Sequence, residues 1–189
     1  MSEPIFVWDT TGLLHAQACD RLDGLIDAAG RERRHLVPSG VMKELQRLGH
    51  TPSHESLEIC DLEEIEEFSV LAGWMARFGS SVPDGRDSGE AWAAAVAELR
   101  DAVAIIDDAK ARRIIRKTAP LLRTRGVLWA ISRGVKEGRA QTPQAYSGLC
   151  DQMLQAHTQH ENLQPLRWPF QAGGYAAWYE KEEQQGHLD

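Results

Sequence analysis

The chain has few of the features that mark several large classes of protein. Its 189 residues include three cysteines, which are widely spaced and form no C-x-x-C pair. An odd number of separated cysteines argues against a disulfide framework and indicates free thiols in a reducing compartment. No stretch approaches 18 uncharged apolar residues, and the first residues lack a basic segment followed by an apolar one. We therefore expect no membrane span, no signal peptide and a cytoplasmic location.

Common nucleotide-binding and hydrolase signatures are also missing. The sequence contains no G-x-x-x-x-G-K-[ST], no G-x-G-x-x-G and no G-x-S-x-G. These absences argue against phosphate-loop nucleotidases, dinucleotide-binding proteins and serine hydrolases of the α/β type. Two histidine pairs, at 50 and 54 and at 157 and 160, lack the further ligands of a zinc site.

Acidic residues stand where predicted strands give way to helices. The apolar run 5–8 ends at one such acid, and the apolar run 102–106 ends at a pair of them. Two more acids lie in the opening turns of predicted helices. The five acids are Asp9, Glu44, Glu90, Asp107 and Asp108.

Short apolar runs alternate with segments of helical periodicity along the first 140 residues. We predict strands at 5–8, 36–37, 57–59, 102–106 and 119–122, with helices between them. A helix that packs through Leu71 and Met75 is expected to bury Ile65 and Phe68 as well. This alternation predicts an α/β fold of three layers, α/β/α, with a central parallel sheet of about four to five strands.

The carboxyl ends of parallel strands form one crevice, so these acids are expected to converge although they are far apart in sequence. Two carboxylates about 4 Å apart repel by roughly 4 kcal/mol at an effective dielectric near 20. A divalent ion would relieve that repulsion, and a set of oxygen ligands suits Mg²⁺ or Mn²⁺ better than zinc. The chemistry that follows is metal-assisted hydrolysis of a phosphodiester.

Each acid taken alone also has a simpler interpretation. Acidic residues are favoured in the first turn of helices, where they cap backbone N–H groups and face the helix dipole. Asp87 and Ser88, in the turn before Glu90, are expected to be such capping groups. The joint occurrence of the acids, in this order, favours the metal site over independent caps.

The acids and their neighbours resemble the successive motifs of PIN-domain nucleases. The matching segments are Asp9-Thr10-Thr11, Pro38-x-x-Val41-x-x-Glu44-Leu45, Gly89-Glu90 before an alanine-rich helix, and Asp107-Asp108-Ala109-Lys110-Ala111-Arg112. The resemblance implies a Mg²⁺- or Mn²⁺-dependent ribonuclease related to VapC-type toxins, and an antitoxin partner. It implies that Asp9, Glu44, Glu90 and Asp108 are the catalytic metal-binding acids, with Asp107 competing for the fourth place and Thr11 as a nearby hydroxyl. Arg123-Thr124-Arg125-Gly126 departs from the Gly-Thr step that many members have before the final helix.

The charge of the chain is unevenly distributed. The formal net charge is -7, and residues 55–67 alone carry seven acids and no Lys or Arg. Residues 101–140 hold ten basic residues against four acids, a local charge of +6. This basic segment follows the last acidic motif, where Arg112, Arg113 and Arg116 are expected to hold RNA phosphates. A solvated helix face, or an ion pair between Arg112 and an acid, explains the same residues.

We predict two domains: a nuclease domain over 1–140, and a helical, aromatic extension over 141–189 that packs on it or at an interface. The extension's aromatic residues are expected to serve packing more than base stacking. A homodimer is expected from the resemblance. Two alternatives stay open: a non-catalytic PIN-like module that binds RNA or protein, and a phosphatase of the haloacid-dehalogenase type. Against the phosphatase, this chain has Thr11 where such enzymes have a second aspartate.

Overall fold

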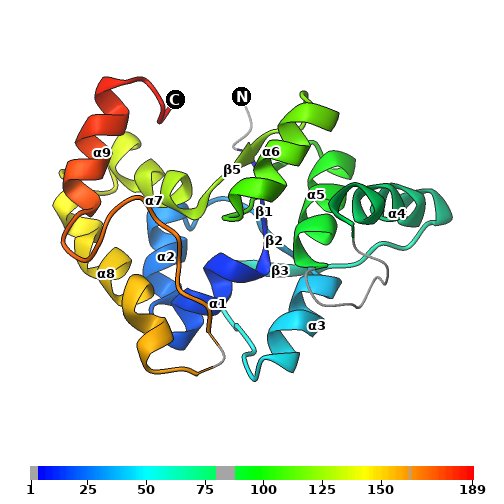
Figure 1. The fold of residues 1–189 in the computed structure, drawn as a ribbon, viewed down its shortest axis with the longest axis horizontal. Helices are drawn as coiled ribbons and strands as arrows, with labels where there is room; N and C mark the ends of the chain where they lie inside the picture. Colours follow the sequence, from blue (N-terminus) through cyan, green and yellow to red (C-terminus); the bar gives the residue numbers. More distant parts are fainter. Residues whose placement is uncertain (1–3, 80–87, 162) are drawn as a thin grey trace. The chain divides into compact units, whose positions relative to one another are not determined.

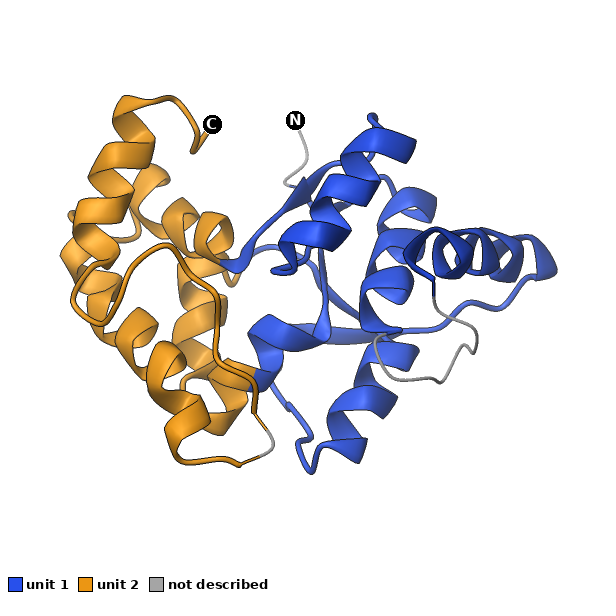
Figure 2. Ribbon diagram, in the orientation of Figure 1, with its two compact units in different colours: residues 1–14, 32–127 blue, residues 15–31, 128–189 orange. Residues whose placement is uncertain are grey.

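The computed structural model describes residues 4–79, 88–161 and 163–189. The chain forms two compact units (Figure 2). Unit 1 contains the residues up to Leu14 together with Glu32–Val127, and unit 2 contains His15–Arg31 together with Leu128–Asp189. These units are clusters of contacts, so the domain boundary after residue 140 stays a prediction.

Unit 1 is built on a sheet whose five described strands all run parallel (Figure 1). The strands are β1 (Phe6–Trp8), β2 (His35–Pro38), β3 (Leu57–Cys60), β4 (Val103–Ile105) and β5 (Thr124–Arg125). Their order across the sheet is β3-β2-β1-β4-β5. Helices cover this sheet in a three-layer α/β/α fold, which confirms the predicted fold class.

The order of the strands reverses between β1 and β4. From β1 the chain moves to one side through β2 and β3, and it then crosses to the other side for β4 and β5. In open parallel sheets, ligands bind outside the carboxyl ends of the strands at such a switch point. Here the backbone N–H of Asp9 donates to the carbonyl of Ile105 at 3.0 Å, which joins the carboxyl ends of β1 and β4.

The centre of unit 1 is apolar and closely packed. All three side chains of β1 are fully buried. The indole N–H of Trp8 donates to Nδ1 of the buried His35 at 3.0 Å, so the polar atoms of both rings in this contact are satisfied. A Cβ atom at Gly40 would lie 2.1 Å from the Trp92 ring, so only glycine permits this approach of α3 to α5.

Four helices of unit 1 follow β2, β3 and β4. They are α3 (Ser39–Arg47), α4 (Ile65–Phe78), α5 (Gly89–Leu99) and α6 (Ala109–Thr118). The α4 helix packs against α5 and α6, and it buries Leu71, Trp74 and Met75. Ile65 and Phe68, which the helical pattern placed on the buried face, are 80% and 47% exposed. The buried face of α4 therefore begins one turn later than periodicity predicts.

The last strand lies further along the chain than predicted. Residues 119–122 form a turn in which the N–H of Leu122 donates to the carbonyl of Ala119, and Leu121 is 95% exposed. The strand is instead Thr124–Arg125, where the buried Thr124 pairs with Ala104 of β4. The apolar residues at 119–122 suggested a strand, but Pro120 has no N–H to donate to a neighbouring strand.

Unit 2 is helical in its described part. Its helices are α2 (Leu22–Ala29), the 3-10 helices η1 (Pro143–Tyr146) and η2 (Ala156–Thr158), α8 (Ser147–Gln155) and α9 (Tyr175–Gln184). Helices α1 (Thr10–Ala18) and α7 (Val127–Lys136) begin in unit 1 and continue in unit 2. Asp20, with a φ of 56°, separates α1 from α2. Tyr175 and Tyr179 are buried, and Phe170 and Trp178 pack beside Tyr175.

No helix among the described residues has the length and apolar character that crossing a membrane requires.

Candidate active site

Asp9 is a buried acid at the carboxyl end of the central strand β1. It is 2% exposed, and its Oδ2 accepts no hydrogen bond from the part of the chain that the structure describes. Buried carboxylates are normally paired with hydrogen-bond donors or bound to cations, because leaving one unpaired is costly. Asp9 is therefore the described residue that most clearly calls for a positively charged ligand.

Glu44 from α3 reaches the same place. The hydroxyl of Thr10 donates to its Oε2 at 2.7 Å, which fixes this carboxylate beside the first turn of α1. Gly89, the first residue of α5, shows how near the oxygens are to one another. A Cβ atom there would lie 2.6 Å from Thr10 Oγ1 and 2.7 Å from both Asp9 Oδ1 and Glu44 Oε2. Three oxygen atoms from two separate segments, the β1–α1 junction and α3, therefore converge over a glycine that leaves space for them.

The electrostatics of Asp9 reflect this crowding. Burial raises the pKa of its carboxyl well above the usual range, and the negative charges of Glu90 and Glu44 raise that pKa further. Hydrogen bonds from the backbone of Thr10 and Thr11 oppose the shift. Glu90 thus acts on Asp9 together with Glu44, and the three acids share one electrostatic environment.

The start of α5 brings Glu90 to this environment. Glu90 is half-buried in the first turn of α5, directly after Gly89. Ser88, which the sequence suggested as a capping residue, makes no side-chain cap, and its buried hydroxyl bonds to no described residue. Asp87 and most of the turn before it lie outside the described residues.

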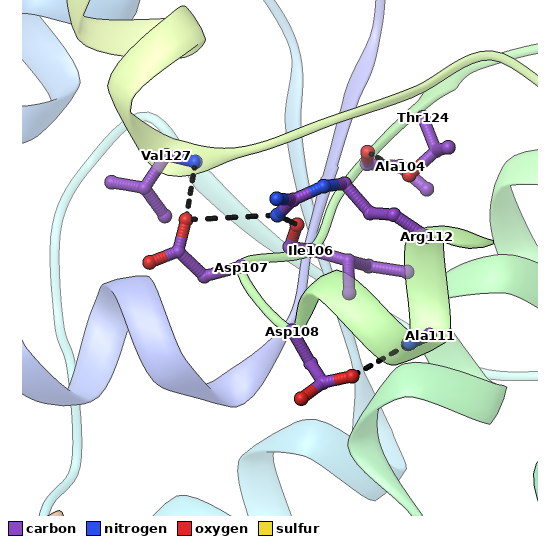
Figure 3. Close-up of polar contacts among 8 residues, drawn as sticks. All are labelled: Ala104, Ile106, Asp107, Asp108, Ala111, Arg112, Thr124 and Val127. Carbon is purple, nitrogen blue, oxygen red and sulfur yellow. Dashed lines mark hydrogen bonds and ion pairs between the residues drawn. The ribbon is translucent and has the colours of Figure 1, made fainter. Parts of the chain in front are cut away.

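The other two predicted acids serve as helix caps (Figure 3). Asp108 is exposed, and its Oδ1 accepts from the backbone N–H of Ala111 at 2.6 Å, which caps α6. Asp107 is half-buried, and its Oδ1 accepts from the N–H of Val127, the first residue of α7, at 3.0 Å. Both side chains lie at the carboxyl end of β4, as predicted. Their membership of a metal site stays a prediction.

The predicted phosphate-binding arginines differ in their surroundings. Arg113 and Arg116 are exposed on α6. Arg112 is half-buried, and its Nη1 donates to the carbonyl of Ile106 at 2.7 Å and lies 4.0 Å from Asp107 Oδ1 (Figure 3). Thr11, the predicted hydroxyl of the site, is half-buried in the first turn of α1.

The residues around Asp9 suit a hard divalent cation. The available ligand atoms are carboxylate and hydroxyl oxygens, one buried carboxylate oxygen has no partner in the described part of the chain, and glycine provides the space between them. Within residues 4–79, 88–161 and 163–189, however, no three His, Cys, Asp or Glu side chains already stand in a metal-binding arrangement. The carboxylates of Asp9, Glu44 and Glu90 thus influence one another electrostatically, although their oxygens do not surround a single ion position.

Two residues of this site escaped the sequence analysis. The hydroxyl of Thr10 donates to Glu44, whereas the resemblance implied its neighbour Thr11. The only signal was a hydroxyl next to Asp9, and the sequence does not say which of two adjacent threonines faces the acid. Gly89 belongs to the Gly89-Glu90 motif, but no sequence pattern indicates that three oxygens lie close to it.

A family model described as a PIN domain matches residues 5–160. The matched range includes every predicted site residue and all five described strands of the sheet. No curated protein and no solved structure matches the chain.

Proposed function

Because the chain belongs to the PIN-domain family, whose members are generally nucleases, we propose that it is a divalent-metal-dependent endoribonuclease. Its substrate is single-stranded RNA, and its site is the carboxyl edge of the sheet around Asp9. The acids of the site are Asp9, Glu44, Glu90 and Asp108. The membership leaves the phosphatase alternative without support.

One observation carries the proposal. The oxygens of Asp9, Thr10 and Glu44 converge above Gly89, and the buried Asp9 Oδ2 has no partner among the described residues. This arrangement raises the pKa of Asp9 and therefore destabilises its charged form. Proteins retain such arrangements mostly at functional sites, because packing alone gives no reason to bring acids together.

Mg²⁺ or Mn²⁺ held by these acids would act as a Lewis acid toward a phosphodiester and its attacking water. The chain's own residues do the rest. Thr10 keeps Glu44 oriented by donating to it, and Gly89 keeps the space beside the carboxylates open. The exposed Arg113 and Arg116 supply positive charge on α6 where a phosphate backbone passes.

The direct test is cleavage of a labelled single-stranded RNA in Mn²⁺, in Mg²⁺ and in EDTA. We expect wild type to cleave only with a divalent ion, and Asp9→Asn and Asp108→Asn to lose cleavage. Asp101→Asn is the matched control, because Asp101 is an exposed acid at the amino end of the same strand β4. Equal degradation by wild type and Asp9→Asn would show a contaminating nuclease and would end the proposal.

The second candidate is a PIN-like module that binds RNA without cutting it. It is favoured by the lack, among the described residues, of three ligand side chains already arranged for a metal. The same experiment separates the two functions. If wild type binds the RNA in Mn²⁺ and leaves it intact, the protein is a binding module.

A toxin role, an antitoxin partner, a homodimer and a cytoplasmic location belong to the proposal. Induced expression of wild type and of Asp9→Asn tests the toxin role. We expect wild type to arrest growth and the variant not to do so. Gel filtration with light scattering tests the homodimer.

A further inference from the structure

The carboxyl end of β4 is held by a side-chain arrangement that the catalytic proposal does not use. Asp107 Oδ1 accepts from the backbone N–H of Val127, and Arg112 donates to the carbonyl of Ile106 while facing the same Asp107 oxygen (Figure 3). Neither side chain is fully exposed, at 11% for Asp107 and 27% for Arg112. These contacts bind the β4–α6 turn to the first residue of α7.

Gly126 makes this arrangement possible. A Cβ atom at Gly126 would lie 3.2 Å from both Arg112 Nη1 and Asp107 Oδ1. Any side chain at this position would push the guanidinium or the carboxylate away from the backbone between β5 and α7 by a few tenths of an ångström. The Thr-Arg-Gly step, which departs from the family pattern, therefore has a local structural use.

Backbone hydrogen bonds connect this arrangement to Asp9. The N–H of Ile106 donates to the carbonyl of Arg125 at 2.8 Å, and the N–H of Asp9 donates to the carbonyl of Ile105 at 3.0 Å. A shift of the Ile105–Ile106 backbone would therefore move the backbone of Asp9. Displacements of about 1 Å at a reacting group can cost about 100-fold in rate.

We propose that Asp107 and Arg112 are a pair of positioning residues that fixes the end of β4 and, through it, Asp9. The inference rests on the proposed nuclease function for its consequence in catalysis. Asp107 is then not a metal ligand, and the fourth acid of the site is Asp108. The cap on α6 uses only Oδ1 of Asp108, so its Oδ2 can bind the metal. Arg112 is no phosphate contact, in contrast to the exposed Arg113.

The chain contains a matched control for Arg112. Arg123 donates to the carbonyl of Asp101 at 2.6 Å and lies 3.4 Å from the Asp101 carboxylate, at the amino end of β4. The same pair of contacts therefore occurs at both ends of one strand, but only one end adjoins Asp9. Removing Arg123 removes similar chemistry where no positioning of the site is expected.

The first measurement is steady-state RNA cleavage by Arg112→Gln, Arg112→Lys, Arg113→Gln and Arg123→Gln. For Arg112→Gln we expect kcat to fall about 10- to 100-fold with KM within about twofold, and Arg112→Lys to recover part of the loss. For Arg113→Gln we expect a higher KM and a salt dependence weaker by about one phosphate contact. Arg123→Gln should match wild type. A rise in KM and a weaker salt dependence for Arg112→Gln would make it a phosphate contact and overturn the proposal.

The second measurement is thermal unfolding without metal or RNA, for Asp107→Asn, Arg112→Gln and the double variant. Asparagine still accepts from Val127 but loses the charge that faces Arg112. We expect the double variant to melt near the lower single variant, because the two side chains act together. Additive shifts in melting temperature would show that the pair does not exist.

Mn²⁺ binding followed by calorimetry completes the design. We expect Asp108→Asn to weaken binding more than Asp107→Asn, and the reverse order would make Asp107 the ligand. Failure of the proposed function and failure of the Asp107–Arg112 pair give different results. Wild type that cleaves no RNA contradicts the proposed function, whereas the melting experiment tests the pair whether or not the protein is a nuclease.

Discussion

The two ends of strand β4 carry similar residues in different surroundings. At the amino end, Asp101 and Arg123 are 102% and 49% exposed in their side chains. At the carboxyl end, Asp107 and Arg112 are 11% and 27% exposed, and the backbone of Asp9 lies alongside. Exposed ion pairs are screened by water and contribute little, whereas charges out of water depend strongly on their neighbours. Location in the sheet, and not residue type, therefore decides how far these charged side chains are withdrawn from water.

Gly89→Ala should produce the largest effect among substitutions that leave every acid of the site in place. The new Cβ would come within 2.7 Å of oxygens of Asp9 and Glu44 and within 2.6 Å of Thr10 Oγ1, so these groups must move apart. We expect RNA cleavage to fall about 100-fold, with a loss of about 1–3 kcal/mol in the free energy of unfolding. Gly148→Ala in α8 is the control, because its Cβ meets nothing within 4 Å. Cleavage by Gly89→Ala at the wild-type rate would show that the convergence of oxygens is irrelevant.

Thr10→Val should have the next largest effect. It removes the donor to Glu44 Oε2 with little change in shape. We expect about a 10-fold loss of cleavage, the size seen when groups that orient metal ligands are removed. The control is Thr118→Val, whose exposed hydroxyl donates only to the carbonyl of Ile114 within its own helix. A Thr10→Val protein as active as Thr118→Val would leave the orientation of Glu44 without importance.

Asp9→Asn should stabilise the protein in metal-free buffer at neutral pH. The pKa of Asp9 is raised well above the usual value for an aspartate, first by burial and then by the charge of Glu90. A raised pKa stabilises the fold below the pKa of the unfolded chain, and this contribution is lost as the pH rises through the folded pKa. We expect a gain on the order of 1 kcal/mol at pH 7, which vanishes near pH 4. Chemical unfolding at both pH values measures it, and a less stable variant at pH 7 would contradict the assigned electrostatics.

Arg123→Gln and Asp101→Asn at the amino end should have the smallest effects. Both groups are largely exposed, so we expect changes within about 0.5 kcal/mol in the free energy of unfolding and none in cleavage. Thermal unfolding at low and high salt checks this. A loss of activity here would erase the distinction between the two ends of β4.

The sequence was sufficient for the fold class and for the edge of the sheet that bears the acids. Apolar runs that end at Asp9 and Asp107 located β1 and β4, because a buried parallel strand must be continuously apolar. The parallel arrangement then placed both groups of acids at one edge. The short strand at Thr124–Arg125 had no such run, since two residues pair with β4 mainly through backbone atoms.

The details of the site depend on contacts that leave no pattern in the sequence. Asp107 and Asp108 are adjacent and chemically identical, and only coordinates show that one caps α7 while the other caps α6. Arg112 and Arg113 are likewise neighbours, yet only Arg112 turns to the carbonyl of Ile106. Helix α9 was not predicted, because its residues, Tyr175 to Gln184, mix aromatic and charged side chains without clear periodicity.

We propose that Asp9, Glu44 and Glu90 together bind a divalent cation. Thermal unfolding of wild type and Asp9→Asn, each in EDTA and in excess Mn²⁺, tests it most directly, because a ligand that binds only the folded state raises its stability. We predict that Mn²⁺ raises the melting temperature of wild type by several degrees and that of Asp9→Asn little or not at all. An equal rise in both proteins, or none in wild type, would contradict the claim.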